Sequence, residues 1–181
     1  MERTQPRLCE ASQSIMTAMK RLSSAVMLVA LCLSNTAPAI RAQRASDAAR
    51  KRFVGNWKLV SYQAFSESGE ARTLDYDGGR IMYDDHGYMA AQLMRSGRAK
   101  SALATDEERA AAYRGYTAYY GTYEIDEAKG VVTHHVEGAL SPQWPGTTLV
   151  RYYTFSEDGK RLTLSIKTGD RITGTLTWER L

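Results

Sequence analysis

The side chains best suited to chemistry in this sequence are two adjacent histidines, His134 and His135. They lie in an apolar stretch with strand character, and neighbouring strand residues point to opposite faces, so the pair cannot bind one metal ion together. His135 shares a face with Glu137, and His86 would join them only if its turn folded nearby. Because such metal sites need three or four converging ligands, we predict no bound metal and interpret both histidines as surface or hydrogen-bonded residues.

An arginine on the inward face of a predicted strand indicates ligand binding more strongly than the two histidines do. Along residues 148–155 the alternation places Arg151 on the same face as Tyr153. An arginine inside a protein requires a carboxylate, which the protein or a ligand supplies. One interpretation is that Arg151 holds the acidic or carbonyl head of a ligand that tyrosines and His134 orient. The other is that Arg151 faces water or pairs with a neighbouring glutamate.

The candidate ligand-binding residues are polar or aromatic side chains that alternation turns toward one shared face, together with one loop tryptophan. A one-residue bulge in a strand would reverse that face. Residues 141–146 read Ser-Pro-Gln-Trp-Pro-Gly, and this stiff loop is expected at a rim, either beside a cavity mouth or packed down on the strands. The predicted set is Gln63, Tyr83, Tyr123, His134, Trp144, Arg151 and Tyr153.

The motifs of several common enzyme classes are missing. The sequence has no Gly-x-Ser-x-Gly, no phosphate-binding Walker loop and no dinucleotide fingerprint. Asp84 and Asp85 form a pair of carboxylates, but they stand at a glycine-containing hairpin tip, which is typical of a solvated turn. We therefore assign no catalytic residue and no cofactor.

Short strands separated by turn residues account for most of the chain after residue 52. One helix is expected where the capping box of Thr105 and Glu108 precedes tyrosines at helical spacing, Tyr113, Tyr116 and Tyr120. This helix would cover outer apolar surface or cap an opening. The expected strands are residues 53–65, 80–83, 88–94, 119–125, 131–140, 148–155, 161–167 and 172–179.

Eight or nine strands with short connections predict an all-β antiparallel meander with one short helix. Closure into an up-and-down barrel would remove the exposed sheet edges at this chain length. A β-sandwich is the alternative, because hairpin spacing alone does not separate the two.

The first strand opens with Gly55-Asn56-Trp57, which resembles the Gly-x-Trp signature of lipocalins, and Arg180 ends the last strand. The resemblance implies a calycin-type barrel with an internal cavity, in which Arg180 packs across Trp57 by a cation–π contact and closes the base. It implies no particular reaction. Three further stretches are similar to the bacterial and fungal lipocalin-like domain family, within a resemblance that covers roughly residues 53–181: residues 79–83, 121–124 and 133–138.

The N-terminal region has the pattern of a secretory signal peptide. Lys20 and Arg21 precede a short apolar run and then small residues at positions 37, 39 and 42. The run is well short of the ~20 residues of a membrane-spanning helix. We expect removal of residues 1–42, with 43–52 as a polar lead and 53–181 as the barrel; the alternative is a buried N-terminal helix.

Removal of this region changes the charge and the cysteine content. The formal charge is +4 for the whole chain and +1 for residues 43–181, which leaves no basic footprint for nucleic acid. Both cysteines, Cys9 and Cys32, belong to the removed part. The mature domain therefore depends on core packing rather than on disulfides, and no membrane span is expected in it.

The sequence as a whole predicts an exported, periplasmic or extracellular barrel that binds a small hydrophobic or amphipathic molecule without catalysis. One alternative is an isomerase or cyclase acting on a polyketide- or terpenoid-like molecule, with His134, Tyr153 and Arg151 as acid–base groups. The other is a cell-envelope interaction module whose barrel is filled.

Overall fold

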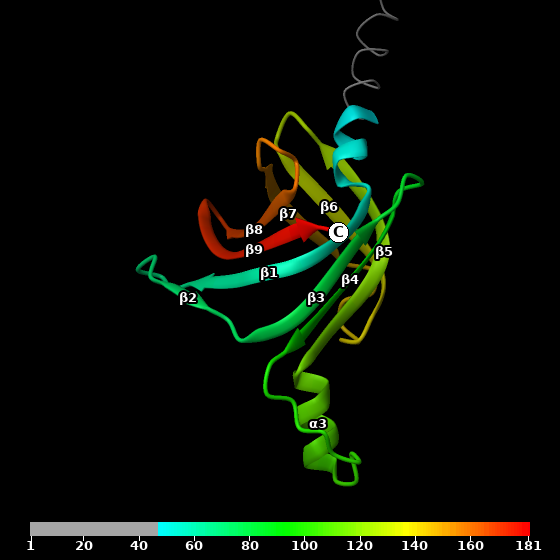
Figure 1. Ribbon diagram of the computed structural model, residues 1–181, viewed down its shortest axis with the longest axis vertical. Helices are drawn as coiled ribbons and strands as arrows, with labels where there is room; N and C mark the ends of the chain where they lie inside the picture. The colour runs from blue at the N-terminus through cyan, green and yellow to red at the C-terminus, as the bar shows by residue number, and fades with distance from the viewer. Residues whose placement is uncertain (1–46) are drawn as a thin grey trace, which may run out of the picture. The chain divides into compact units, whose positions relative to one another are not determined.

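The computed structural model describes residues 47–181, which form nine antiparallel strands and two helical segments. The strands follow one another as neighbours around the sheet, and β1 also pairs with β9, so the sheet closes (Figure 1). The elements are β1 (Gly55–Phe65), β2 (Ala71–Thr73), β3 (Tyr76–Tyr83), β4 (Tyr88–Arg95), α3 (Asp106–Arg114), β5 (Tyr116–Asp126), β6 (Val131–Ala139), β7 (Thr148–Phe155), β8 (Arg161–Thr168) and β9 (Arg171–Arg180).

The predicted all-β, up-and-down barrel is confirmed, and the alternative of a sandwich is wrong. β1 pairs with β3 along one edge and with β9 along the other, so no gap separates two sheets. The short strand β2 continues the sheet beside the far end of β1. Closure satisfies the backbone hydrogen bonds that a sandwich of this size would leave along its edge strands.

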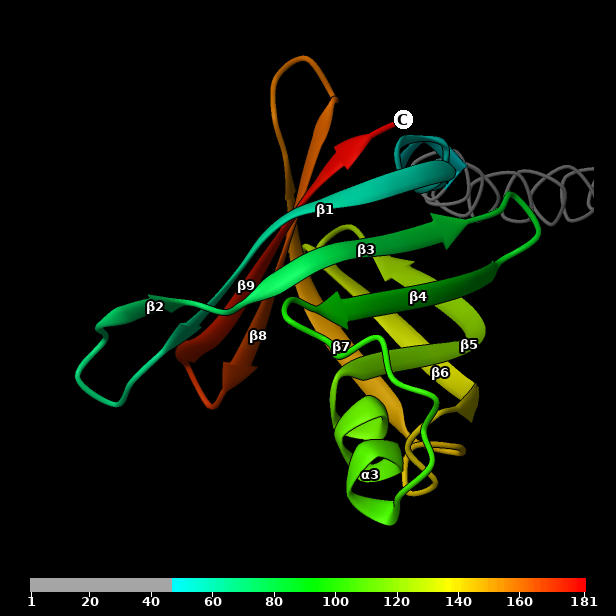
Figure 2. The same cartoon turned by 60° about the horizontal axis from the view of Figure 1, so that its bottom comes forward.

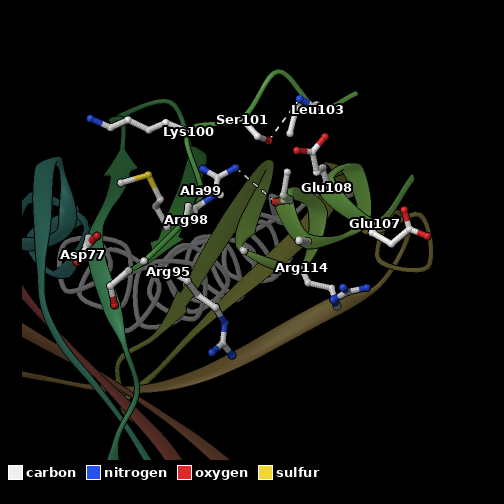
Figure 3. Close-up of a pocket in the computed structure, with 16 residues that line it drawn as sticks. Asp77, Arg95, Arg98, Ala99, Lys100, Ser101, Leu103, Glu107, Glu108 and Arg114 are labelled. Atoms are coloured by element: carbon white, nitrogen blue, oxygen red, sulfur yellow. Dashed lines mark hydrogen bonds between the residues drawn. The ribbon is translucent and has the colours of Figure 1, made fainter. Parts of the chain in front are cut away.

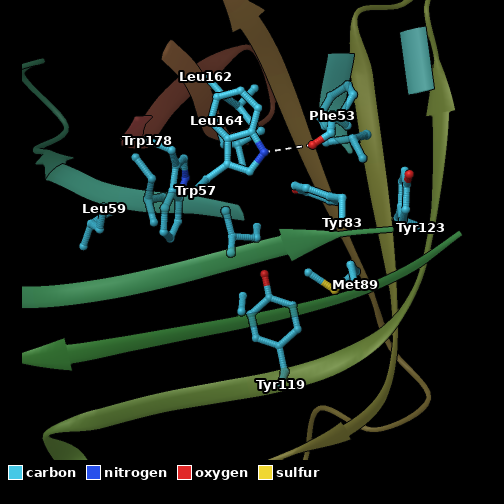
Figure 4. Close-up of a cluster of buried hydrophobic side chains, with 14 of the residues drawn as sticks. Phe53, Trp57, Leu59, Tyr83, Met89, Tyr119, Tyr123, Leu162, Leu164 and Trp178 are labelled. Carbon is cyan, nitrogen blue, oxygen red and sulfur yellow. Dashed lines mark hydrogen bonds between the residues drawn. The ribbon is translucent and has the colours of Figure 1, made fainter. Parts of the chain in front are cut away.

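The core lies inside the barrel and is made by the inward half of each alternating strand. Trp57 on β1, Ile81 on β3 and Leu162 on β8 are at most 1% exposed. Trp57 and Trp178 lie close together among leucines, with Phe53 beside Trp57 (Figure 4). Burial of two tryptophans and a phenylalanine is a large apolar contribution to the stability of a domain that has no disulfide.

A β-bulge in β1 reverses the face of the second half of that strand. The register against β9 shifts between Leu59 and Ser61. After the bulge Tyr62 pairs with the buried Leu176 and packs on the core, whereas Gln63 pairs with Thr175. The prediction that Gln63 shares the inward face of Trp57 is therefore wrong, and Tyr62 takes that place.

The chain enters the barrel through a helical segment, residues 47–53, where the sequence pattern predicted a polar lead followed by a strand from Phe53. Phe53 ends this segment and is fully buried, and Ala49 is also buried. The backbone carbonyl of Phe53 accepts a hydrogen bond of 2.8 Å from Trp57 Nε1 (Figure 4). The segment thus closes one end of the barrel, which we call the closed end.

The helix α3 begins at the predicted capping box. Thr105 Oγ1 accepts a hydrogen bond from the Glu108 amide, and Glu108 Oε2 accepts one from the Thr105 amide. The helix ends at Arg114 with Gly115 as its C-cap, so Tyr116 and Tyr120 lie on β5 and not on the helix as predicted. Figure 2 shows α3 between β4 and β5, at the end of the barrel opposite residues 47–53, which we call the α3 end.

The predicted signal peptide, its cleavage site and both cysteines lie outside the described residues. Within residues 47–181, no helix has the length and the apolar character needed to cross a membrane.

Candidate functional site

A hydrogen-bonded chain of three side chains occupies the middle of the barrel. His134 on β6 is fully buried, and its Nε2 lies 2.8 Å from the Tyr83 hydroxyl oxygen. Its Nδ1 lies 3.0 Å from the hydroxyl oxygen of Tyr119 on β5. A neutral imidazole has one donor and one acceptor nitrogen, so one tyrosine donates to the ring and the other accepts from it.

Arg151 reaches the same region from β7. It pairs with Val132, which is fully buried, and its neighbours two residues away, Leu149 and Tyr153, both pack on the core. The arginine therefore faces inward, where it is half-buried. Its side chain donates a hydrogen bond of 3.0 Å from Nη1 to the carbonyl oxygen of Val150. No acidic side chain of residues 47–181 forms an ion pair with it.

The charge of Arg151 acts on three tyrosine hydroxyls and on the His134 imidazole. It lowers the pKa of the Tyr83, Tyr119 and Tyr62 hydroxyls, against the larger effect of burial, which raises all three pKa values. We call Tyr62, Tyr83, Tyr119, His134 and Arg151 the interior polar cluster.

His134 is held neutral. Burial lowers the pKa of His134 to about 3, and the positive charge of Arg151 acts in the same direction. Strongly perturbed pKa values grouped inside a barrel are typical of a functional site. At neutral pH the cluster therefore offers uncharged hydroxyl and imidazole groups around one permanent cation.

Two of the predicted ligand-binding tyrosines belong to the closed end of the barrel. The Phe53 ring makes edge contacts with Tyr83 and Tyr153, with centroids 5.3 and 4.8 Å apart. Tyr123 donates a hydrogen bond of 2.6 Å to the Asp84 carbonyl oxygen, and burial raises its pKa to about 12. Tyr123 and Tyr153 thus seal the barrel beneath the interior polar cluster.

The three residues named for barrel closure lie together at the same end. The Arg180 guanidinium carbon lies 4.1 Å from the centroid of the Trp57 ring. Arg180 also donates to the carbonyl oxygens of Val54 and Arg52 at 2.8 and 2.5 Å. At Gly55 an added Cβ would stand 2.9 Å from Arg180 Nη1, so the guanidinium occupies the space of a side chain there.

Trp144 packs at the opposite end, in the loop between β6 and β7. Its ring makes an edge contact with the Tyr119 ring at a centroid distance of 5.6 Å. Tyr62 stacks on Tyr76 of β3 at 5.5 Å near the same end. The aromatic side chains at the α3 end therefore adjoin the interior polar cluster directly.

The sequence pattern missed two members of this cluster, Tyr62 and Tyr119. On β5, Tyr119 lies two residues before Gly121 and four before Tyr123, both of which were predicted to face inward. The same alternation, applied at the first residue of the predicted strand, would have placed Tyr119 inside. No comparable signal existed for Tyr62, because the bulge that turns it inward leaves no clear mark in the sequence.

The histidine pair occupies opposite sides of β6, as adjacent strand residues do. His134 is inside, whereas His135 Nε2 lies 3.5 Å from Glu124 Oε2 on the outer face. His86 lies beside Asp85 in the exposed turn after β3. In the described part of the chain, no three His, Cys, Asp or Glu side chains converge as metal ligands would.

Eight of the nine strands close the barrel, with β2 added beside β1, and a closed barrel of this size with a polar cluster inside belongs to the class of small barrels that hold side chains or one small ligand. The chain belongs to the lipocalin-like domain family, whose sequence profile matches residues 54–181. A search of the curated proteins found no match.

The solved structures that the chain matches include a redesigned β-barrel and the fluorescent protein UnaG. The redesigned barrel is 12% identical, with a TM-score of 0.38, over 74% of this chain and 95% of that chain. Wild-type UnaG is also 12% identical, with a TM-score of 0.35, over 72% of this chain and 98% of that chain.

Proposed function

We propose that the barrel binds a small, partly apolar molecule whose acidic or carbonyl head group contacts Arg151. The observation that carries this proposal is a guanidinium inside the barrel without an acidic partner among the described residues. A cation in a partly desolvated interior is unfavourable unless it is paired, and a ligand carboxylate would pair it. Arginine also offers two parallel donors to such a group.

The groups around Arg151 fit the rest of such a ligand. The Tyr62 and Tyr119 hydroxyls lie near enough to the guanidinium for its charge to lower their pKa, so they are polar groups in the region that the head group would occupy. Leu149 and Ile166 pack on the core while they remain partly exposed, so they offer apolar contact to the ligand body. A few placed polar groups within an apolar lining are typical of small-molecule sites.

Calorimetric titration of the protein with dodecanoic acid and with dodecanol tests the head-group assignment. The acid should bind more tightly, and Arg151→Gln should weaken the acid by about 1.5–3 kcal/mol with little effect on the alcohol. Arg161→Gln, an exposed arginine on β8, is the matched control. Equal binding of the acid to the wild-type protein and to Arg151→Gln would refute the assignment, and so would the absence of any binding.

The low pKa of His134 supports binding without catalysis. A histidine whose pKa is about 3 is a weak base at neutral pH, whereas general acid–base catalysis works best when the pKa lies near the working pH. The second candidate, an isomerase or cyclase, rests on the Tyr83–His134–Tyr119 chain as a route for protons. Recovery of a bound molecule unchanged after incubation favours binding, and recovery of an isomer favours the enzyme.

The proposed site of action is outside the cytoplasm, in the periplasm or beyond the cell. The basic, apolar and small-residue order of residues 20–42 supports export. Fractionation of cells that express the full chain, compared with a chain lacking residues 1–42, tests this. An exported protein shortened to begin near residue 43 is expected, and retention of the full-length chain in the cytoplasm would contradict it.

A further inference from the structure

A second arginine lies at the α3 end, on the same face of β4 as the buried Leu93. Arg95 is the last residue of β4 and pairs with Tyr76 of β3. Its guanidinium carbon lies 5.3 Å from the centroid of the Tyr76 ring, and Tyr76 stacks on Tyr62. No carboxylate of residues 47–181 forms an ion pair with Arg95. Arg95 is therefore an exposed cation at the rim, connected to the interior through two stacked tyrosines.

The Tyr62 hydroxyl lies under the influence of both arginines. The charges of Arg151 and Arg95 each lower its pKa, although burial, the largest effect, raises it. The stacked Tyr62–Tyr76 pair therefore contacts Arg95 at the rim and lies within reach of the Arg151 charge inside the barrel.

Arg95 also lines a hollow of about 1100 Å³ between the end of β4 and α3 (Figure 3). Arg98, Lys100 and Arg114 add three more cations to this hollow. Of its three carboxylates, that of Glu108 already accepts hydrogen bonds from the Ala104 and Thr105 amides, at 2.7 and 3.0 Å. The lining of the hollow thus has one more cation than carboxylates, an excess of positive charge that favours an acidic group beside Arg95.

We propose that the ligand carries two acidic groups, one bound by Arg151 inside the barrel and one by Arg95 at the rim, with its apolar body against the Tyr62–Tyr76 stack. This inference rests on the proposed function, because it assumes that the barrel interior is the binding site. It names the ligand class as an elongated, amphipathic diacid. A monoacid would satisfy Arg151 alone and leave Arg95 to solvent.

Titration with dodecanoic acid and dodecanedioic acid, which differ by one terminal carboxylate, tests this inference. The diacid should bind the wild-type protein roughly three- to tenfold more tightly, as expected for an exposed ion pair reinforced by a two-donor arginine. Arg95→Gln should remove that advantage and leave the affinity for the monoacid within about twofold, because an exposed side-chain change has little effect elsewhere. Arg151→Gln should weaken both acids.

The control variant is Arg80→Gln, an exposed arginine on β3 that pairs with the exposed Gln92 on the outer face of the barrel. It should leave both affinities unchanged. Diacids of increasing length should show an optimum in the wild-type protein that Arg95→Gln abolishes, since only one length spans both cations.

The outcomes separate the two proposals. Equal affinities for the monoacid and the diacid, or a diacid advantage that survives Arg95→Gln, would overturn the diacid inference while the binding proposal stands. Binding of neither acid would overturn the binding proposal and the inference with it.

Discussion

Replacement of Arg180 by alanine should destabilise the closed end of the barrel. The guanidinium stacks on Trp57 and donates to two carbonyl oxygens of the segment that leads into β1. A cation–π contact contributes about 0.5–2 kcal/mol, and a hydrogen bond from a charged donor about 1.5–3 kcal/mol. Arg180 is half-buried and its contacts are not independent, so we expect a total loss of about 2–4 kcal/mol rather than the full sum.

Urea unfolding followed by tryptophan fluorescence measures this loss. Arg180→Lys keeps a cation near the ring and loses the planar pair of donors, so its loss should fall between those of the wild type and Arg180→Ala. Hydrogen exchange should also quicken at the amides of residues 50–54, because the carbonyl groups that Arg180 holds belong to that segment.

The matched control is Arg161→Ala, an exposed arginine that pairs with Glu179 on the neighbouring strand. A surface change of this kind is expected within about 0.5 kcal/mol of wild type. If Arg180→Ala unfolded at the same urea concentration as Arg161→Ala, the assignment of barrel closure to Arg180 would be wrong.

Three further predictions concern the inside of the barrel. The pKa of His134 is lowered to about 3 by folding, so stability should be fully present above pH ~6.5 and fall by up to about 1.4 kcal/mol per pH unit as the pH drops toward 3. Urea unfolding of His134→Gln across the same pH range should lack this component. Gly121→Ala should cost about 3 kcal/mol or more, because its Cβ would stand 1.9 Å from the His135 carbonyl oxygen, whereas Gly78→Ala, with no atom within 4 Å, should be nearly neutral. Arg151→Leu should raise the unfolding free energy of the unliganded protein by about 1 kcal/mol, measured by the same method, and a lower value would contradict an unpaired interior cation.

The strand order and most strand bounds follow from the sequence because the connections are short and marked by glycine. The predicted strand at residues 148–155 has the same bounds as β7, and those at 161–167 and 172–179 differ from β8 and β9 by one residue at their ends. Gly159 and Gly169, in the turns around β8, have φ values of +67° and +61°, which glycine adopts without strain. Turn chemistry therefore fixed where each of these strands begins and ends.

Prediction failed where tertiary contacts, rather than local pattern, decide the conformation. Phe53 continues the alternation of β1, but its burial at the closed end places it in the helical segment before that strand. Tyr116 and Tyr120 have helical spacing, yet Gly115 ends α3 and both residues pair with β4 in the sheet. Spacing alone does not separate the two outcomes, because the same residues fit either period.

The site is only partly readable from the sequence for the same reason. Arg151 could be placed inward because β7 has no bulge, and an inward arginine needs a partner whatever its neighbours are. Tyr62 could not be placed inward from the sequence, because one extra residue in β1 reverses the face of the strand. The sequence therefore did not predict the stacked tyrosines near Arg95 and Arg151. The interior cation lowers the stability of the empty barrel and raises the affinity for an acid, so Arg151→Leu should gain about 1 kcal/mol in stability and lose affinity for the acid.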